Sequence, residues 1–472
     1  MCPILTLRPA ASFMQLLSCV AKQFLSGIQL NGSFSLPSTF ASFSSLYFST
    51  LLMLLGSGLL STYLGLRLSA ANVSEIWIGV LMTAYYVGLV MGASVGHRLI
   101  AQVGHIRAFV ASAGIVTASV LGHALTSSVE VWLVLRWLVG VAMMCQYMVL
   151  ESWLNEQAES HQRGRVFAGY MLVTFLGLGL GQLVLTLMPE LSMRHIILVA
   201  MCFALCLVPV AVTRRLHPAP LHPAPLEVRL FVKRIPQALS TIGVAGLLLG
   251  AFYGLAPAYA SSVGLDTEHV GVFMAVTIGA GLLAQWPAGW LSDRLDRSRM
   301  IQVNAIVLTT VSLLIALVAW PQLLLLLTGI FGLLAFTLYP LAVALANDHV
   351  EQEERVLLSA MLLVTFGLGA SAGPLLGSVL MKFGGAPMLY VFMACSSLLL
   401  VIFVRPERVT GEHLVEEAPI QFMPAAGNLA SSPLAAAIDP RVDEQVVIDQ
   451  MQEETDPQEQ PVAEEDDEHR PG

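Results

Sequence analysis

The sequence predicts an all-α integral membrane protein with twelve transmembrane helices in two pseudo-symmetric bundles of six. Three observations lead to this fold class: the composition, the spacing of the apolar segments, and an internal repeat. Of the 472 residues, 56% are hydrophobic and only 12% are charged, whereas a soluble domain carries about 25% charged residues. A chain with about half that share of charge belongs to the membrane class.

The apolar segments are long enough to cross a bilayer. A hydrocarbon core about 30 Å thick needs about 20 apolar residues of helix. Lipid offers no partner to a free backbone amide, so each spanning segment must be helical. The predicted helices cover residues 44–66, 76–97, 106–127, 131–150, 166–188, 194–213, 236–259, 268–290, 300–319, 322–346, 356–381 and 387–404.

The placement of Lys and Arg predicts the orientation, because cytoplasmic loops are enriched in these residues. The loops on the side of both termini hold thirteen of them, and the loops on the other side hold only Arg67, Arg194 and Lys382. Both termini and the middle loop are therefore expected in the cytoplasm.

The predicted organisation has five parts. Residues 1–43 are a leader that is either unstructured or precedes the true start. Residues 44–213 and 236–404 are the two six-helix bundles. Residues 214–235, with a doubled HPAPL, form a basic cytoplasmic linker that is expected to be an extended spacer. Residues 405–472 hold 17 Asp or Glu against 4 Lys or Arg, so this acidic tail is expected to be disordered.

The internal repeat appears when the sequence is shifted by 192 residues. The matching residues are rarer in apolar runs than Leu or Val: Gly79 with Gly271, Arg107 with Arg299, Gly140 with Gly332, Tyr147 with Tyr339, and Asn155 with Asn347. Six crossings return the chain to its starting side, so the two halves have the same orientation. Parallel halves around a midplane cavity are an architecture that transporters use.

The loop between the eighth and ninth predicted helices carries a resemblance. Its sequence, Gly289-Trp-Leu-Ser-Asp293-Arg294-Leu-Asp-Arg297, resembles the G-x-x-x-D-R-x-G-R signature of the major facilitator superfamily, with Asp296 in place of the second glycine. The resemblance implies a gating loop, formed by Gly289, Asp293, Arg294 and Arg297, that holds one conformation shut through charge-assisted hydrogen bonds. The first-half copy is degenerate, because Ala101-Gln102 replaces the Asp-Arg pair.

Further motifs narrow the resemblance. Arg136-Trp-Leu-Val-Gly140 and Gly373-Pro374-Leu-Leu-Gly377 are similar to other motifs of the superfamily. The segments Gln285-Trp286-Pro287-x-Gly289, Phe336-Thr-Leu-Tyr339-Pro340 and Tyr253-Gly-Leu-Ala-Pro257 resemble a poorly characterised bacterial branch, the YcaD-like transporters. This resemblance implies a multi-pass protein of the bacterial inner membrane, and it supplies no substrate.

Arg136 and Glu151 are the two charged side chains inside the predicted spans. An ionisable group at the centre of a membrane helix costs roughly 2.5–3.5 kcal/mol, so such a residue is a functional candidate. Arg136 is expected to contact an anionic substrate or to be a partner in proton coupling, with a snorkelled or carbonyl-bonded structural arginine as the alternative. Glu151 is either a protonatable carboxylate or, as the favoured interpretation, an ion-pair partner of the basic loop 96–107 at the membrane rim.

Polar residues within the predicted helices are candidates for the wall of a substrate cavity. Such walls are mostly apolar with a few placed polar groups. Each of these residues could equally make an interhelical hydrogen bond. Tyr147 and Tyr339 rank first, because the repeat makes them equivalent, and the others are Tyr63, Gln146, Gln182, Tyr253 and Gln285.

The expected function is that of a secondary transporter rather than an enzyme. No Walker sequence is present, and no nucleophile and base are paired as an enzyme would require. The predicted activity is movement of a small, weakly polar or amphipathic organic solute by alternating access, with proton-coupled export as its expected mode. A transporter-derived receptor or scaffold is the alternative. The expected partners are the substrate, the lipid bilayer and protons, without nucleic acid, cofactor or metal, and the expected state is a monomer.

Overall fold

The computed structural model describes residues 36–158, 163–212, 228–318, 320–350 and 354–404. Every regular element within these ranges is a helix, which agrees with the predicted fold class. The helices are α2 (Leu36–Ala70), α3 (Glu75–Val103), α4 (His105–Leu125), α5 (Val129–Gln157), α6 (Arg163–Leu187), α7 (Met193–Leu205), α8 (Leu207–Val212), α9 (Val228–Arg234), α10 (Pro236–Ser262), α11 (Thr267–Ser292), α12 (Arg297–Leu317), α13 (Pro321–Asn347), α14 (Arg355–Gly384) and α15 (Met388–Phe403).

The membrane spans correspond to the twelve predicted segments. Eleven spans among the described residues are long and apolar enough to cross a membrane, and α15 is a shorter apolar helix. The sixth span, predicted as one helix, is divided into α7 and α8 at Cys206. Pro209 explains the break, because its ring would clash with the carbonyl group of Leu205 and it has no backbone N–H to donate.

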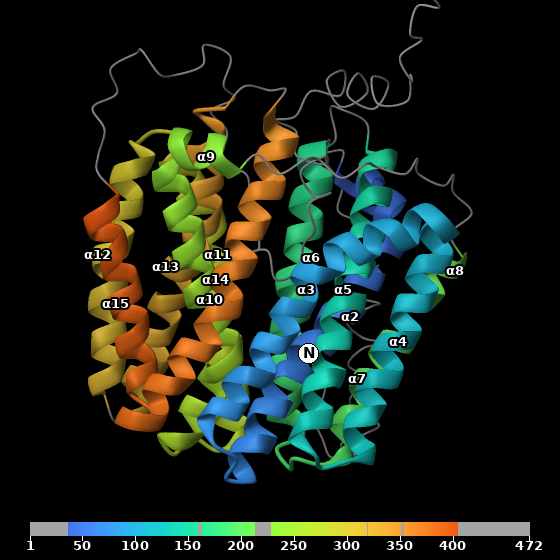
Figure 1. Cartoon of the computed structure of the whole chain (residues 1–472), viewed down its shortest axis with the longest axis horizontal. Coiled ribbons are helices and arrows are strands. Elements are labelled where there is room, and N and C mark those ends of the chain that lie inside the picture. Colours follow the sequence, from blue (N-terminus) through green and yellow to red (C-terminus); the bar gives the residue numbers. More distant parts are fainter. Residues whose placement is uncertain (1–35, 159–162, 213–227, 319, 351–353, 405–472) are drawn as a thin grey trace, which may run out of the picture.

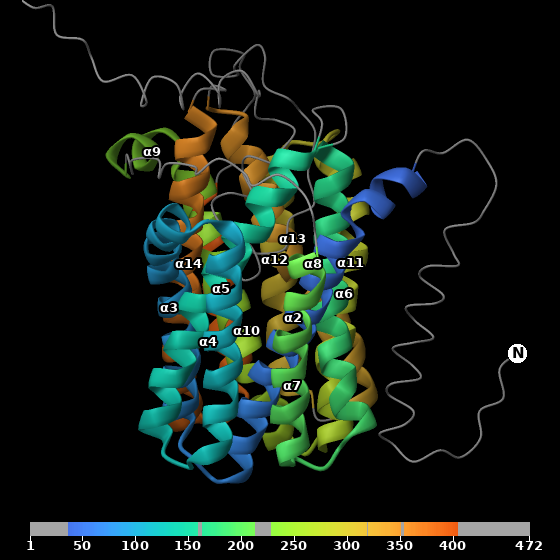
Figure 2. The ribbon, with the colours of Figure 1, turned by 90° about the vertical axis from the view of Figure 1, so that its right-hand side faces the viewer.

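The helices form two bundles that stand side by side in Figure 1, and the first bundle lies in front of the second in Figure 2. In the first bundle α3 packs on α5 and α2 on α6, and in the second bundle α11 packs on α13 and α10 on α14. The two bundles meet where α3 packs on α14, where α6 packs on α11, and where α10 contacts α2 and α3. The interface between the halves is therefore made by equivalent helices from each half.

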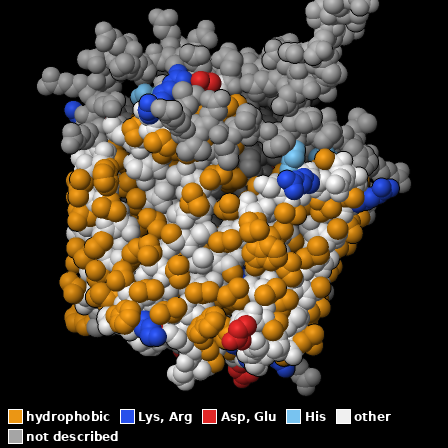
Figure 3. Space-filling view, viewed as in Figure 1, with side chains coloured by type: hydrophobic (Ala, Val, Ile, Leu, Met, Phe, Trp, Pro, Cys, Tyr) orange, Lys and Arg blue, Asp and Glu red, His pale blue; other side chains and the backbone are white. Residues whose placement is uncertain are grey.

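The surface has the pattern of a membrane protein. Hydrophobic side chains cover the middle of the face in Figure 3, and the charged side chains that are visible lie near its two edges. We call the edge with the α3–α4 and α11–α12 turns the basic end, because Arg98, Arg107, Arg294 and Arg299 are exposed there. The edge with the α2–α3 and α10–α11 turns is called the opposite end.

Helix contacts repeat at the same shift of 192 residues that relates the sequences. A Cβ atom at Gly140 would collide with the carbonyl oxygen of Tyr85, and one at Gly332 would collide with that of Thr277. These two glycines allow α5 to approach α3, and α13 to approach α11, to a distance that any larger residue would prevent. The duplication therefore extends from the sequence to the helix contacts.

The glycine-rich faces of α6 and α14 also lie in equivalent places. A Cβ atom at Gly181 would lie 2.5 Å from the carbonyl oxygen of Leu55 on α2. The equivalent Gly373 would collide with the carbonyl oxygen of Leu247 on α10. These small residues bring together helices of the same bundle.

Parts of the predicted organisation lie outside the described residues. These parts are residues 1–35 of the leader, the doubled HPAPL of the linker and the acidic tail. The last part of the predicted linker is helical instead of extended, because residues 228–234 form α9.

Candidate functional site

Arg136 lies at the centre of the first bundle and is completely buried. It is seven residues from the start of α5, which corresponds to about 10 Å along the helix. Its Nη2 atom donates a hydrogen bond of 2.5 Å to the hydroxyl oxygen of Ser61 on α2. Its guanidinium carbon lies 4.3 Å from the ring centroid of Tyr85 on α3, a distance typical of a cation–π contact.

The remaining donors of Arg136 have no partner. The Nε and Nη1 atoms are buried without a hydrogen bond. No carboxylate among the described residues lies within ion-pair distance of the guanidinium. A buried charge is costly unless it is paired and hydrogen-bonded, so this arginine has unused binding capacity.

Tyrosines surround the guanidinium. Its titratable neighbours are the phenols of Tyr85, Tyr86 and Tyr147 and the imidazole of His123, and the rings of Tyr85 and Tyr86 lie 5.4 Å apart. Tyr147 is completely buried, and its hydroxyl group has no hydrogen-bond partner. Both polar atoms of the buried Gln146 side chain are also unpaired. The interior of the first bundle is thus polar but incompletely satisfied.

Aromatic rings on α10, α13 and α14 of the second bundle pack against one another, and we call this group the aromatic wall. Tyr253 on α10 packs edge-on against Phe336 on α13, with centroids 5.9 Å apart. Tyr339 packs in the same manner against Phe366 on α14, at 5.3 Å. Phe175 on α6 of the first bundle contacts Phe336 at 5.7 Å, so the aromatic wall crosses the interface between the halves.

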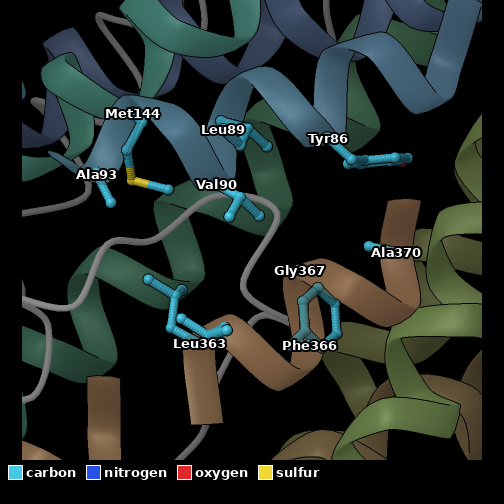
Figure 4. Close-up of a pocket in the computed structure, with 10 residues that line it drawn as sticks. Tyr86, Leu89, Val90, Ala93, Met144, Leu363, Phe366, Gly367 and Ala370 are labelled. Carbon is cyan, nitrogen blue, oxygen red and sulfur yellow. The ribbon is translucent and has the colours of Figure 1, made fainter. Parts of the chain in front are cut away.

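An apolar cavity of about 40 Å³ opens between α3, α5 and α14. Figure 4 shows Tyr86, Leu89, Val90, Ala93 and Met144 on one side, and Leu363, Phe366, Gly367 and Ala370 on the other. Along α3 these residues follow Tyr85 in the direction of the basic end. The cavity therefore lies between Arg136 and the basic end.

The opposite end is closed by two equivalent glycine contacts. A Cβ atom at Gly79 on α3 would collide with the Ser378 hydroxyl and would lie 2.6 Å from the carbonyl oxygen of Pro374, both on α14. Gly79 on α3 and its repeat equivalent, Gly271 on α11, each lie four residues from the start of their helix, at the opposite end.

The second contact involves Gly271 on α11. A Cβ atom there would lie 2.8 Å from the carbonyl oxygen of Gln182 and 2.9 Å from the Thr186 hydroxyl, both on α6. Gln182 and Thr186 are the repeat equivalents of Pro374 and Ser378. The bundles thus touch through backbone on both sides of the interface.

Glu151 is completely buried, and the favoured interpretation from the sequence, an ion pair with the basic loop 96–107, stays a prediction. Its Oε1 atom accepts a hydrogen bond of 2.9 Å from the hydroxyl group of Tyr170 on α6. It lies one helical turn beyond Tyr147 on α5. It is the one carboxylate that is buried among the described residues.

The two glutamines lie at different depths. Gln182 is near the opposite end, where its Oε1 atom accepts a hydrogen bond of 2.6 Å from Thr62 and its Nε2 atom is unpaired. Gln285 is near the basic end, where its Nε2 atom donates to the carbonyl oxygen of Phe336 at 3.2 Å and its Oε1 atom is unpaired. Among the described residues, neither glutamine is hydrogen-bonded to Arg136, so these predicted residues do not form one cluster.

The predicted gating loop forms a polar network in the second bundle. Arg297 is buried and donates to the Asp348 carboxylate and, at 3.1 Å, to the carbonyl oxygen of Ala344, both at the end of α13. Its Nη2 atom lies 3.6 Å from a carboxylate oxygen of Asp293. A cation at these carbonyl groups also complements the dipole of α13.

The other residues of the loop complete the turn. Asp296, which departs from the signature, caps α12 by accepting a hydrogen bond of 3.0 Å from the backbone N–H of Arg299. The Arg294 guanidinium stacks on the ring of Trp290 at 3.8 Å. Gly289 accepts the backbone N–H of Asp293 at 3.0 Å. The described contacts thus attach the α11–α12 turn to α13.

Sequence reasoning missed Ser61, Tyr85 and Tyr86, which contact or neighbour Arg136. The repeat relates these residues to a contact in the second bundle, but that contact is known only from the structure. A shift of 192 residues places Thr277 opposite Tyr85 and Thr328 opposite Arg136, and the two threonine hydroxyl oxygens lie 2.7 Å apart. A contact in the second bundle therefore marks the equivalent contact in the first.

Comparison with known proteins is consistent with this architecture. The family model of the Major Facilitator Superfamily matches residues 46–333 and 238–438. An uncharacterized MFS-type transporter of Yersinia pestis (strain Pestoides F) is 30% identical over 348 residues, which are 73% of this chain and 90% of the relative. The uncharacterized MFS-type transporter YcaD of Salmonella newport (strain SL254) is 28% identical over 358 residues, 75% of this chain and 92% of the relative.

Solved structures share the fold. The nucleoside transporter NupG has a TM-score of 0.64 at 13% identity, over 76% of this chain and 96% of that protein. A bacterial homologue of the human lysosomal transporter Spinster, in an inward-facing and occupied conformation, has a TM-score of 0.62 at 13% identity, over 79% of this chain and 96% of that protein. From the family match and the identity to its relatives, this chain belongs to the major facilitator superfamily and is a secondary transporter rather than an enzyme.

Proposed function

We propose that this protein moves a small organic solute across the bacterial inner membrane by alternating access between its two bundles. The basic end faces the cytoplasm in this proposal, because Lys and Arg are concentrated in the loops of that end. The solute binds between Arg136 of the first bundle and the aromatic wall of the second. The two bundles then rock about this site.

The observation that carries the proposal is the difference between the two ends of the interface. At the opposite end, Gly79 and Gly271 bring backbone against backbone at equivalent places. Toward the basic end, the same helix pair α3 and α14 separates enough to form the cavity of about 40 Å³ (Figure 4). A protein closed at one end and hollowed toward the other has the form of one state in an alternating cycle. Further parting of α3 and α14 from this state would admit solute from the cytoplasm.

Glu151 is the proposed carrier of a coupling proton. A carboxylate in the membrane interior is costly when charged, so protonation and deprotonation change its interactions strongly. Its hydrogen-bond donor, Tyr170, lies on α6, which also contacts α11 of the second bundle. A change in the charge of Glu151 can therefore act on a helix that takes part in the movement between the bundles.

Flux through reconstituted protein tests this function. Purified protein in liposomes should accelerate movement of at least one solute from a panel of metabolites and antimicrobials. Gly79→Trp should abolish that flux, because the ring cannot fit against Pro374, and solute binding should persist. Gly114→Trp is the matched control, because Gly114 is exposed on α4 and no atom lies within 4 Å of an added Cβ. Binding without flux in the wild-type protein would instead support the receptor alternative.

A further inference from the structure

The two buried arginines of the described interior differ in how completely they are satisfied. Arg297 contacts the carboxylates of Asp348 and Asp293, a backbone carbonyl and the Ser292 hydroxyl. Arg136 has one hydroxyl partner, one aromatic face and two donors without a partner. The protein therefore neutralises one buried guanidinium with its own carboxylates and leaves the charge of the other uncompensated.

The position of Arg136 connects this charge to the cavity. Tyr86 lines the cavity, its ring lies 5.4 Å from that of Tyr85, and Tyr85 carries the guanidinium on its face. At about 40 Å³, the cavity is much smaller than the roughly 300–1,000 Å³ of a pocket that holds an organic ligand. A solute that reaches Arg136 from the basic end must therefore part α3 and α14, the helices that move in the proposed cycle.

The second bundle offers no equivalent charge to the solute. At the repeat equivalents of Tyr85 and Arg136 it has Thr277 and Thr328, whose hydroxyl groups satisfy each other at 2.7 Å. On the side of the second bundle, Phe366 lines the cavity, and Tyr339 packs edge-on against its ring at 5.3 Å. A ligand that spans the interface meets a cation on one side and aromatic rings on the other.

From this asymmetry we infer that the substrate is an amphipathic organic monoanion, with one carboxylate and an apolar body about the size of an aromatic ring. The carboxylate accepts hydrogen bonds from the free donors of Arg136, which are stronger than those between neutral groups. The apolar body packs against the aromatic wall of the second bundle, where edge-to-face contacts are favourable. This inference rests on the proposed function, because it names the substrate class of the same site.

Binding of matched probes to wild-type protein in detergent tests the inference without requiring transport. The probes are 4-phenylbutyrate, its neutral amide 4-phenylbutyramide, the cation 4-phenylbutylamine, and acetate, each measured by calorimetry at pH 7 up to about 10 mM. We expect 4-phenylbutyrate to bind at least about tenfold more tightly than the amide, the amine and acetate, because hydrogen bonds to a charged group are the stronger ones. Equal or tighter binding of the amide or the amine would overturn the inference, as would binding by none of the four.

Variants then locate the charge. Arg136→Gln should weaken binding of 4-phenylbutyrate at least about tenfold and leave binding of the amide unchanged. Arg299→Gln, which makes the same change at an exposed arginine, should alter neither. Unchanged binding of 4-phenylbutyrate in Arg136→Gln would refute the assignment of the site. The comparison of probes on wild-type protein decides the substrate class even where Arg136→Gln does not fold.

Liposome flux separates this inference from the proposed function. Arg136-dependent binding of 4-phenylbutyrate without flux of any solute would support the site and contradict transport. Flux of neutral or cationic solutes, without preference for the carboxylate probe, would support transport and overturn the substrate class.

Discussion

Replacing Gly271 with alanine should favour the state that is open at the opposite end. The added Cβ atom would lie 2.8 Å from the carbonyl oxygen of Gln182, about 0.6 Å closer than ordinary van der Waals contact allows, and 2.9 Å from the Thr186 hydroxyl. Inserting a methyl group into a well-packed contact costs roughly 1–3 kcal/mol. The cost falls on the state in which α11 and α6 touch, so the ratio of open to closed molecules should rise about 5- to 150-fold.

Spin-label distances across the opposite end measure this shift. Labels at Ala71→Cys and Lys382→Cys, in a background without the native cysteines, place one exposed probe in each bundle at that end. Gly271→Ala should add a population at longer distance. Gly279→Ala is the matched control, because it lies on the same helix and no atom lies within 4 Å of its added Cβ. The same distance distribution in both variants would refute the reasoning, as would a shift to shorter distance in Gly271→Ala.

Two further changes test the buried charges. Arg297→Gln should lower the apparent melting temperature by several degrees, because losing charge-assisted hydrogen bonds at Asp348 costs about 1.5–3 kcal/mol. The control Arg299→Gln loses only an exposed charge and should leave the melting temperature unchanged. Equal melting temperatures in both variants would show that the network adds no stability. Glu151→Gln should abolish solute accumulation driven by a pH gradient in liposomes, because the amide cannot carry a proton. It should preserve solute exchange, because the amide oxygen still accepts a hydrogen bond from Tyr170. Accumulation that persists would exclude Glu151 as the proton carrier.

The fold could be predicted from the sequence because the bilayer imposes a strong local requirement. Any segment that crosses it must satisfy its backbone internally and expose apolar side chains. The number and order of the spans follow from this requirement alone. The division of the sixth span at Cys206 also has a local cause, Pro209, which the prediction did not use.

The candidate site could be predicted only in part. The cost of charge in lipid identified Arg136 and Glu151, and the repeat identified Tyr147 and Tyr339. The sequence did not give their partners, because helical periodicity fixes the depth and face of a residue but not the rotation of the neighbouring helix. The contact between Tyr85 and Arg136 depends on how closely α3 approaches α5, and Glu151 meets Tyr170 only because α6 packs beside α5.

By itself the sequence determined the membrane class, the spans, the duplication and the family, since each depends on local composition or on residues matched along the chain. Tertiary structure alone decided which polar groups are satisfied. It gave Arg297 two carboxylates and Arg136 none, although the side chains of both arginines are buried. It also closed the opposite end through Gly79 and Gly271. These outcomes depend on contacts between helices that are distant in sequence, and such contacts are determined by the packing of whole bundles.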